Sequence, residues 1–288
     1  MEYNLEICNL TKHHSNFSLK NIQLQLPKGS IMGLIGENGA GKTTLIKTIL
    51  GLIKKNEGTI SLFNQQLNSS NEQQIKEHIG VVFDEIHFPE TLTPKNINLS
   101  FSHIYHNWDS SLFWYYIEKF KIPEKKMIKE FSRGMKMKLS IAVALSHNPK
   151  LLILDEATSG LDPVVRNEIL DVFLDFIQNE EHSILMSSHI TTDLEKVCDY
   201  ITFIQNGEIQ FSRSKDEVTE QFGILKCGKE DFKTISKIDI LGYRHSHFGY
   251  EILIENRSSM AKKYPSFVID PATLEDIMLF YGKEISLC

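Results

Sequence analysis

Short apolar runs alternate with helical patterns along much of the chain. Residues 30–35 (SIMGLI) and 151–154 (LLIL) are apolar almost throughout, as expected of strands that are buried on both faces of a parallel sheet. A glycine loop and a helix over about residues 42–50 follow the first run. A second helix is expected after the later run, where Asp162 suits an N-cap and Pro163 the first helical position. This alternation predicts an α/β fold.

The same pattern predicts further elements on both sides of the later run. Strands are expected over residues 58–63, 79–83 and 183–186, and Asn206-Gly207 separates two alternating runs in the manner of a β-hairpin. The stretch from about residue 89 to 147 instead has helical periodicity, and residues 112–120 carry aromatic and aliphatic side chains at helical spacing, typical of a packed helix.

From about residue 223 the pattern starts again. Short strands are expected over residues 250–254 and 267–269, followed by an amphipathic helix after Pro271. We therefore expect a main domain over residues 1–222 and a small accessory domain over residues 223–288. The role of the accessory domain stays open between regulation, dimer stabilisation and protection of a sheet edge.

Composition narrows the function classes. The 288 residues carry 31 basic and 37 acidic side chains, a net charge of −6, which argues against nucleic acid as the main ligand. Cys8, Cys198, Cys227 and Cys288 lie far apart without metal-site spacing, as in a reduced cytoplasmic protein. No secretory signal and no run of about 20 apolar residues is visible, so any membrane role is expected through a partner.

Residues 36–43 (GENGAGKT) fit the phosphate-binding pattern GxxxxGK[ST]. Its glycines let successive backbone N–H groups point inward around phosphates, and the following helix start adds positive potential. Lys42 is expected to reach the β- and γ-phosphates and Thr43 to bind Mg²⁺. A plain glycine turn is the alternative, which the strand before and the helix after the loop disfavour. The predicted nucleotide-binding residues here are Gly36, Glu37, Asn38, Gly39, Ala40, Gly41, Lys42, Thr43 and Thr44.

Two acids end the apolar run 151–154. Asp155 is expected at the carboxyl end of a strand facing the glycine loop, where it can hold Mg²⁺ directly or through water. Glu156 follows, and an acid at that place can orient or deprotonate an attacking water. Many buried strands end in acids, so this pair gains its meaning from the glycine loop upstream.

Three more segments occur in a characteristic order: FSRGM (131–135), SGLD (159–162) and SSH (187–189). Together with the glycine loop and the strand-end acids, this order resembles the ATP-binding subunit of ABC transporters, with its LSGGQ signature, SGLD loop and switch histidine, over about residues 3–215. Taken singly, these segments also fit a plain helix start or a solvated histidine. The resemblance implies a P-loop NTPase core with an antiparallel β subdomain, a helical subdomain over about residues 84–148 and a small C-terminal α/β extension.

The resemblance also implies an ATPase that works as a pair of domains, identical or different. Each ATP would lie between the glycine loop of one domain and the signature helix of the other, so that Ser132 and the Gly134 backbone meet the partner's γ-phosphate. His189 would contact the γ-phosphate of its own site, and Asp162 would help to shape the opposite site. ATP and Mg²⁺ are the implied cofactors. The catalytic candidates are Glu156, His189, Lys42 and Asp84, and the metal candidates are Thr43, Asp155 and Asp84.

Several positions depart from the family pattern. The glutamine expected after residues 79–83 is Asp84, which can still contact Mg²⁺ or water but adds negative charge beside a triphosphate. Arg133 and Met135 replace the usual glycine and glutamine of the signature, and Arg133 is either a phosphate-stabilising cation or a solvated side chain. Either His14 or Phe17 is expected to stack on adenine.

The other histidines lack a third ligand at metal-site spacing and are interpreted as surface or packing residues: His103, His106, His245 and His247.

The likeness to subunits of bacterial ABC-2-type antibiotic exporters predicts a separately encoded transmembrane permease as partner. The chain would then be peripheral on the inner, cytoplasmic face of the plasma membrane. The alternative is a soluble ATPase of this kind that acts on DNA or ribosomes. Family members of the DNA-repair type carry a long coiled coil between the two halves of the ATP site, and no sustained heptad pattern occurs between Lys42 and Asp155. Candidate permease contacts are Phe83, Asp84, His87, Phe88 and Pro89.

Overall fold

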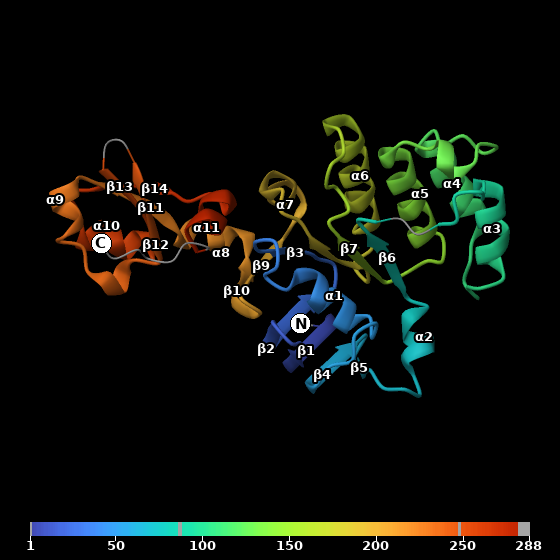
Figure 1. The fold of residues 1–288 in the computed structure, drawn as a ribbon, viewed down its shortest axis with the longest axis horizontal. Helices are drawn as coiled ribbons and strands as arrows, with labels where there is room; N and C mark the ends of the chain where they lie inside the picture. Colours follow the sequence, from blue (N-terminus) through green and yellow to red (C-terminus); the bar gives the residue numbers. More distant parts are fainter. Residues whose placement is uncertain (1, 86–87, 247–248, 282–288) are drawn as a thin grey trace.

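A computed structural model describes residues 2–85, 88–246 and 249–281. Its centre is a six-stranded sheet with the strand order β10-β9-β3-β8-β7-β6 (Figure 1). The strands are β3 (Ile31–Ile35), β6 (Ile79–Phe83), β7 (Leu151–Asp155), β8 (Ser183–Ser187), β9 (Tyr200–Gln205) and β10 (Glu208–Ser214). All pairings in this sheet are parallel except that of β9 with β10. The carboxyl ends of the parallel strands therefore meet at one edge, where ligands bind in open α/β sheets.

The apolar runs in the sequence form the middle of this sheet. Every residue of β3, β7 and β8 is buried, as predicted for strands that are covered on both faces. The hairpin at Asn206-Gly207 is confirmed, since β9 and β10 pair antiparallel around it. Helix α6 (Pro163–Phe176) begins as predicted, because the Asp162 side chain accepts hydrogen bonds from the backbone N–H groups of Val164 and Val165.

An antiparallel sheet in the order β2-β1-β4-β5 forms a second layer. Its strands are β1 (Tyr3–His13), β2 (Ser18–Pro27), β4 (Glu57–Leu62) and β5 (Gln65–Gln66). Apolar residues of this sheet, such as Leu5 and Ile22, share one core cluster with Leu45 of α1 (Lys42–Ile49) and Leu34 of β3. This is the antiparallel β subdomain that the resemblance implies, and it packs against the helix that carries the end of the glycine loop.

A group of helices lies beyond the other end of the central sheet, next to α6 (Figure 1). It comprises α3 (Pro94–Ser102), α4 (Ser110–Lys119), the 3₁₀ turn Ile128–Glu130 and α5 (Arg133–Leu145). The short helix α2 (Glu72–Lys76) precedes β6 and buries Ile75 in the core cluster of the antiparallel sheet instead. Phe113 and Ile117 of α4 are buried in the same core cluster as Leu139 of α5 and Phe173 of α6. The aromatic pattern of residues 112–120 is thus the packed face of a helix, as predicted.

The C-terminal residues form a third sheet, in the order β12-β13-β11-β14, which lies at the opposite end of the molecule (Figure 1). Its elements are β11 (Gly223–Cys227), α9 (Lys229–Phe232), the 3₁₀ turn Lys237–Asp239, β12 (Gly242–Ser246), β13 (Gly249–Ile254), α10 (Arg257–Lys263), β14 (Val268–Pro271) and α11 (Leu274–Tyr281). Two helices come earlier in the chain: α7 (Thr191–Val197) joins β8 to β9, and α8 (Lys215–Gln221) follows β10. Ile277 and Phe280 of α11 join the core cluster that contains Leu194 of α7 and Phe203 of β9. The division of the chain at residues 222 and 223 stays a prediction.

Candidate functional site

The glycine loop joins the carboxyl end of β3 to the start of α1, as the sequence predicts. Gly41 precedes the helix with φ 116°, and a Cβ there would lie 2.7 Å from Cζ of Phe17. Only glycine adopts this backbone conformation readily, and only glycine leaves room for the Phe17 ring against the loop. The loop conformation and the approach of Phe17 therefore depend on the same residue.

Lys42 is the first residue of α1, and its side chain is only 6% exposed. Its ammonium donates hydrogen bonds to the carbonyl oxygens of Gly36 (2.7 Å) and Glu37 (3.3 Å), which the loop wraps around it. The same nitrogen lies 3.6 Å from Oε1 of Glu156. A buried ammonium needs partners of this kind, so the loop and the acid after β7 hold Lys42 in place.

The acids after β7 are held by β8. Ser187 Oγ donates to Asp155 Oδ1 at 2.7 Å and accepts from the backbone N–H of Glu156 at 3.1 Å. Glu156 itself has φ 54°, a left-handed conformation that costs energy for a residue other than glycine. One hydroxyl thus fixes both acids, and the turn at Glu156 separates the directions of their side chains.

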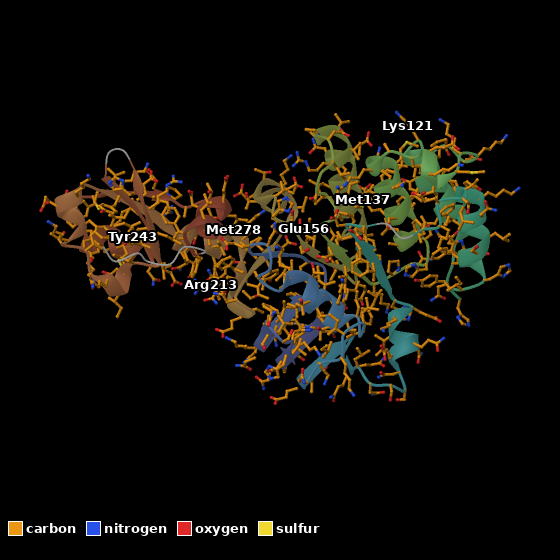
Figure 2. All side chains as sticks on the ribbon, in the orientation of Figure 1. Lys121, Met137, Glu156, Arg213, Tyr243 and Met278 are labelled. Carbon is orange, nitrogen blue, oxygen red and sulfur yellow. The ribbon has the colours of Figure 1, made fainter. Side chains whose placement is uncertain are left out.

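Glu156 also contacts the loop after β8. His189 Nδ1 lies 2.5 Å from Glu156 Oε2, and the His189 backbone N–H donates to the same oxygen at 3.4 Å. One oxygen of this carboxylate therefore faces Lys42 and the other faces His189. Figure 2 shows Glu156 near the middle of the molecule, between the helices around Lys121 and the C-terminal sheet around Tyr243.

These groups open into one cavity of about 530 Å³ at the carboxyl edge of the sheet. A Cβ on Gly39 would meet nothing within 4 Å, so the loop leaves free space beside Lys42. The cavity is lined by His14, Phe17, Asn38, Gly39, Gly41, Lys42, Thr43, Thr44, Asp84, Glu156, Ser159 and His189. An ammonium, carboxylates, a histidine and the start of a helix around an open volume suit a phosphate ester and its hydrolysis.

The comparisons with known proteins agree with this geometry. The family model for ABC transporters matches residues 19–159. The lantibiotic transport ATP-binding protein SrtF of Streptococcus pyogenes is 34% identical over 215 residues, which cover 74% of this chain and 91% of that protein. The chain belongs to the ABC transporter ATP-binding family. Its members are ATPases that power a separate membrane transporter.

Two further comparisons support this family membership. The bacitracin transport ATP-binding protein BcrA of Bacillus licheniformis is 34% identical over 211 residues, 71% of this chain and 68% of that protein. A solved ATP-binding subunit of an ABC transporter has a TM-score of 0.68 and 25% identity, covering 74% of this chain and 91% of that one. The expected fold class, an ABC-type P-loop NTPase, is confirmed.

The ABC signature segment lies outside the cavity. Ser132 is the N-cap of α5, where its hydroxyl accepts from the Met135 backbone N–H at 3.2 Å, and a Cβ on Gly134 would lie 3.4 Å from Val165 Cγ1. Neither residue is part of the cavity wall of its own chain. Arg133 is exposed and forms an ion pair with Asp84, so the choice between a phosphate-stabilising cation and a solvated side chain stays open.

Four other residues proposed for this ABC site are absent from the cavity wall: Gly36, Glu37, Ala40 and Asp155. The first two act on the site through their carbonyl oxygens, which hold Lys42. Asp155 is 5% exposed and lies behind the wall, with Oδ1 bonded to Ser187. Both adenine-stacking candidates line the cavity, with His14 exposed and Phe17 half-buried, so the choice between them stays open.

The remaining expectations for this ABC protein concern histidines, the membrane and docking. His103 is exposed, His106 Nδ1 lies 2.9 Å from Glu77 Oε1, and the His245 ring meets the Tyr250 ring edge-on at 5.3 Å. Within the described ranges, no three metal-ligating side chains cluster and no helix has the length and apolar character of a membrane span.

Among the docking candidates, Asp84 and Pro89 are exposed, and Phe83 and Phe88 are half-buried. The Phe88 ring meets the Phe101 ring edge-on at 6.0 Å, so its position depends on α3. Two residues, His87 and His247, lie outside the residues that the structure describes.

Sequence reasoning missed two residues of the site. Ser159 lines the cavity, although its sequence pattern indicated only a position in the SGLD loop. Ser187 was only the end of a strand, yet it holds both acids. Ser187 lies directly opposite Asp155 in the parallel pairing of β7 with β8. That position would have indicated its role, but it can be recognised only when β7 and β8 are known to be neighbours in the sheet.

Proposed function

We propose that this ATP-binding subunit hydrolyses Mg²⁺-ATP as one of two domains facing each other, and that the pair drives an exporter in the plasma membrane. The observation that carries the proposal is the position of Glu156. It stands in the wall of a 530 Å³ cavity, with Lys42 at 3.6 Å from one carboxylate oxygen and His189 at 2.5 Å from the other.

The roles follow from this arrangement. Lys42 leaves its contact with Glu156 to bind the β- and γ-phosphates while its loop carbonyls keep it oriented. Glu156, freed of that cation, orients the attacking water and accepts its proton. His189 fixes the second oxygen of Glu156 and stands where a γ-phosphate would be sensed. The loop N–H groups of residues 36–43 and the start of α1 surround the phosphates.

The cavity suits a magnesium nucleotide. Thr43 and Asp84 present oxygen atoms on its wall, and Asp155 lies directly behind. Oxygen atoms of this kind are the ligands that Mg²⁺ prefers. When bound, the ion would offset the negative charge of the phosphates. Phe17 or His14 would stack on the base at the other end of the cavity.

Pairing is supported by what the cavity lacks. Ser132 and Gly134 stand at the start of α5, where a helix has positive potential, but they do not line their own chain's site. In a head-to-tail pair these groups would seal the partner's nucleotide, so one domain alone would hydrolyse ATP poorly.

The decisive experiment uses Glu156→Gln, with Lys42→Ala as the matched variant. Glu156→Gln should still bind MgATP, form a stable pair by sedimentation velocity and release almost no phosphate. Lys42→Ala should lose most of its affinity for MgATP, because the phosphate contact is gone. Unchanged phosphate release by Glu156→Gln, or undiminished binding by Lys42→Ala, would contradict these roles.

Export and the membrane partner are proposed from relatives named for lantibiotic and bacitracin transport. The chain should then lie on the inner face of the plasma membrane. It would dock on a permease through the exposed Asp84 and Pro89 and the half-buried Phe83 and Phe88. Affinity purification from solubilised membranes should recover that permease. Vesicles reconstituted with this subunit and the permease, with ATP outside, should then accumulate the exported drug, antibiotic or peptide inside. Recovery only with ribosomes or the nucleoid would favour the alternative, an ATPase acting on those targets.

A further inference from the structure

Two unusual residues of this chain contact each other. Asp84 replaces the glutamine that the family pattern has after β6, and Arg133 replaces a glycine of the signature. The Arg133 guanidinium donates a hydrogen bond to Asp84 Oδ1 and forms an ion pair with it. The residues are 49 positions apart, on different elements, so the contact comes from the fold. The negative charge that Asp84 introduces is thus paired with the positive charge that Arg133 introduces.

Asp84 belongs to the nucleotide cavity. It follows β6 directly, and β6 pairs with β7 so that Phe83 lies opposite Asp155. Asp84 and Glu156 therefore leave the sheet side by side, and both line the cavity. A nucleotide triphosphate bound there would bring several more negative charges close to these two carboxylates, which is unfavourable unless cations offset them.

Two cations, Lys42 and Arg133, pair with these two carboxylates. Lys42 lies 3.6 Å from Glu156 and pairs with that acid. Arg133 pairs with Asp84, and within residues 2–85, 88–246 and 249–281 no other ion pair involves that carboxylate. When Lys42 turns to the phosphates, Arg133, which does not itself line the cavity, remains paired with Asp84 of the wall.

Arg133 also contacts the loop that follows Glu156. A Cβ on Gly160 would lie 3.1 Å from Cζ and from one terminal nitrogen of Arg133, and Gly160 has φ +66°. Glycine at 160 therefore lets the guanidinium lie flat against the loop backbone. The single side chain joins the cavity wall, the start of α5 and the loop before α6.

We infer that Arg133 is a positioning residue for nucleotide binding in its own chain: it neutralises Asp84 and holds it against the cavity wall. The inference rests on the proposed function, since it assumes that a triphosphate occupies this cavity. It assigns Arg133 a role in cis, distinct from the contact with the partner's phosphate that its place in the signature suggests. The two departures from the family pattern then compensate each other.

The test is a double-mutant cycle on MgATP affinity. Asp84→Asn and Arg133→Met remove charge at nearly constant size. Binding of a fluorescent ATP analogue with Mg²⁺ is measured at protein concentrations where sedimentation shows single chains, so that no partner phosphate is present. Arg133→Met should weaken binding about fivefold, because Asp84 then repels the phosphates, and the loss should shrink at high salt. The cycle is repeated in EDTA, where a contact of Asp84 with Mg²⁺ plays no part, and there the double variant should return to within about twofold of the natural protein.

A second ion pair on the same helix supplies the control. Lys136 Nζ lies 3.4 Å from Glu90 Oε1, and neither residue lines the cavity. Lys136→Met and its combination with Glu90→Gln should leave MgATP affinity unchanged. Both pairs are partly exposed, so none of these variants should fail to fold.

The outcomes separate the inference from the proposed function. If the natural protein binds no MgATP, or if Lys42→Ala binds it equally well, the proposed function fails. If Lys42→Ala abolishes binding but Arg133→Met leaves it intact, only the role in cis is overturned. A loss in Arg133→Met that Asp84→Asn does not rescue would equally overturn it, because Arg133 would then act without Asp84.

Discussion

Ser187 offers a sharp test of how the site is built. Its buried hydroxyl donates to Asp155 Oδ1 at 2.7 Å and accepts from the Glu156 N–H at 3.1 Å. A hydrogen bond to a charged group contributes about 1.5–3 kcal/mol. The Glu156 N–H keeps the Ser187 carbonyl at 3.2 Å as a second acceptor, so the carboxylate bond is the main loss. Ser187→Ala should therefore lower the free energy of unfolding by about 2 kcal/mol.

Turnover should fall as well, because both acids lose part of their fixation. A loss of about 1.4 kcal/mol in transition-state stabilisation corresponds to about a tenfold lower kcat. Urea denaturation gives the stability and phosphate release at saturating MgATP gives kcat. Ser187→Thr keeps the hydroxyl and should recover most of the turnover.

Ser183, at the other end of β8, is the matched control. It is also fully buried, and its hydroxyl donates to the Pro27 carbonyl at 2.8 Å and accepts from Asn4 Nδ2 at 3.0 Å. These partners are neutral, so Ser183→Ala should cost about 1 kcal/mol of stability and leave kcat unchanged. Equal effects of the two variants on kcat, or no effect of Ser187→Ala, would refute the reasoning.

Three other predictions follow from buried groups. Phe113→Ala should lower the free energy of unfolding by about 3–5 kcal/mol in urea denaturation, since its ring is fully buried among aromatic side chains; a cost below 1 kcal/mol would show that α4 is dispensable. Burial lowers the pKa of His147 below 6.5, so the unfolded chain takes up its proton first and stability should fall as pH drops through about 6.5. His147→Gln should flatten that dependence in denaturation series from pH 7.5 to 5.5, and an unchanged slope would contradict it. Burial strongly raises the pKa of Cys198, so a thiol reagent read by peptide mapping should modify exposed Cys8 in the native protein and Cys198 only after unfolding.

The sequence predicted best those elements whose signals are local. The apolar runs gave β3 and β7, the Asp162-Pro163 pair gave the start of α6, and Asn206-Gly207 gave the hairpin, each within one or two residues. Strand β1 escaped notice because Asn9 has φ 51° and the register shifts there, which interrupts the alternation that identifies a strand.

The same difference between local and long-range signals applies to the residues of the functional site. The glycine loop and the pair of strand-end acids are each a short continuous segment, so their chemistry could be predicted from the sequence. The contacts of Ser187 with Asp155 and of Arg133 with Asp84 join residues 32 and 49 positions apart. Such pairs depend on which strands and helices become neighbours, and one sequence alone does not carry that information.

The packing of α11 has a practical consequence for work with shortened chains. Phe280 and Ile277 cover Phe203 of β9 and Leu194 of α7, and α7 starts only two residues after His189. A chain cut after β10 would expose Phe203 of β9 and Leu194 of α7 to solvent and promote aggregation. Low ATPase activity in such a fragment would then reflect a disrupted fold and not the chemistry of the site. Kinetic measurements on this protein should therefore use a chain that retains α11.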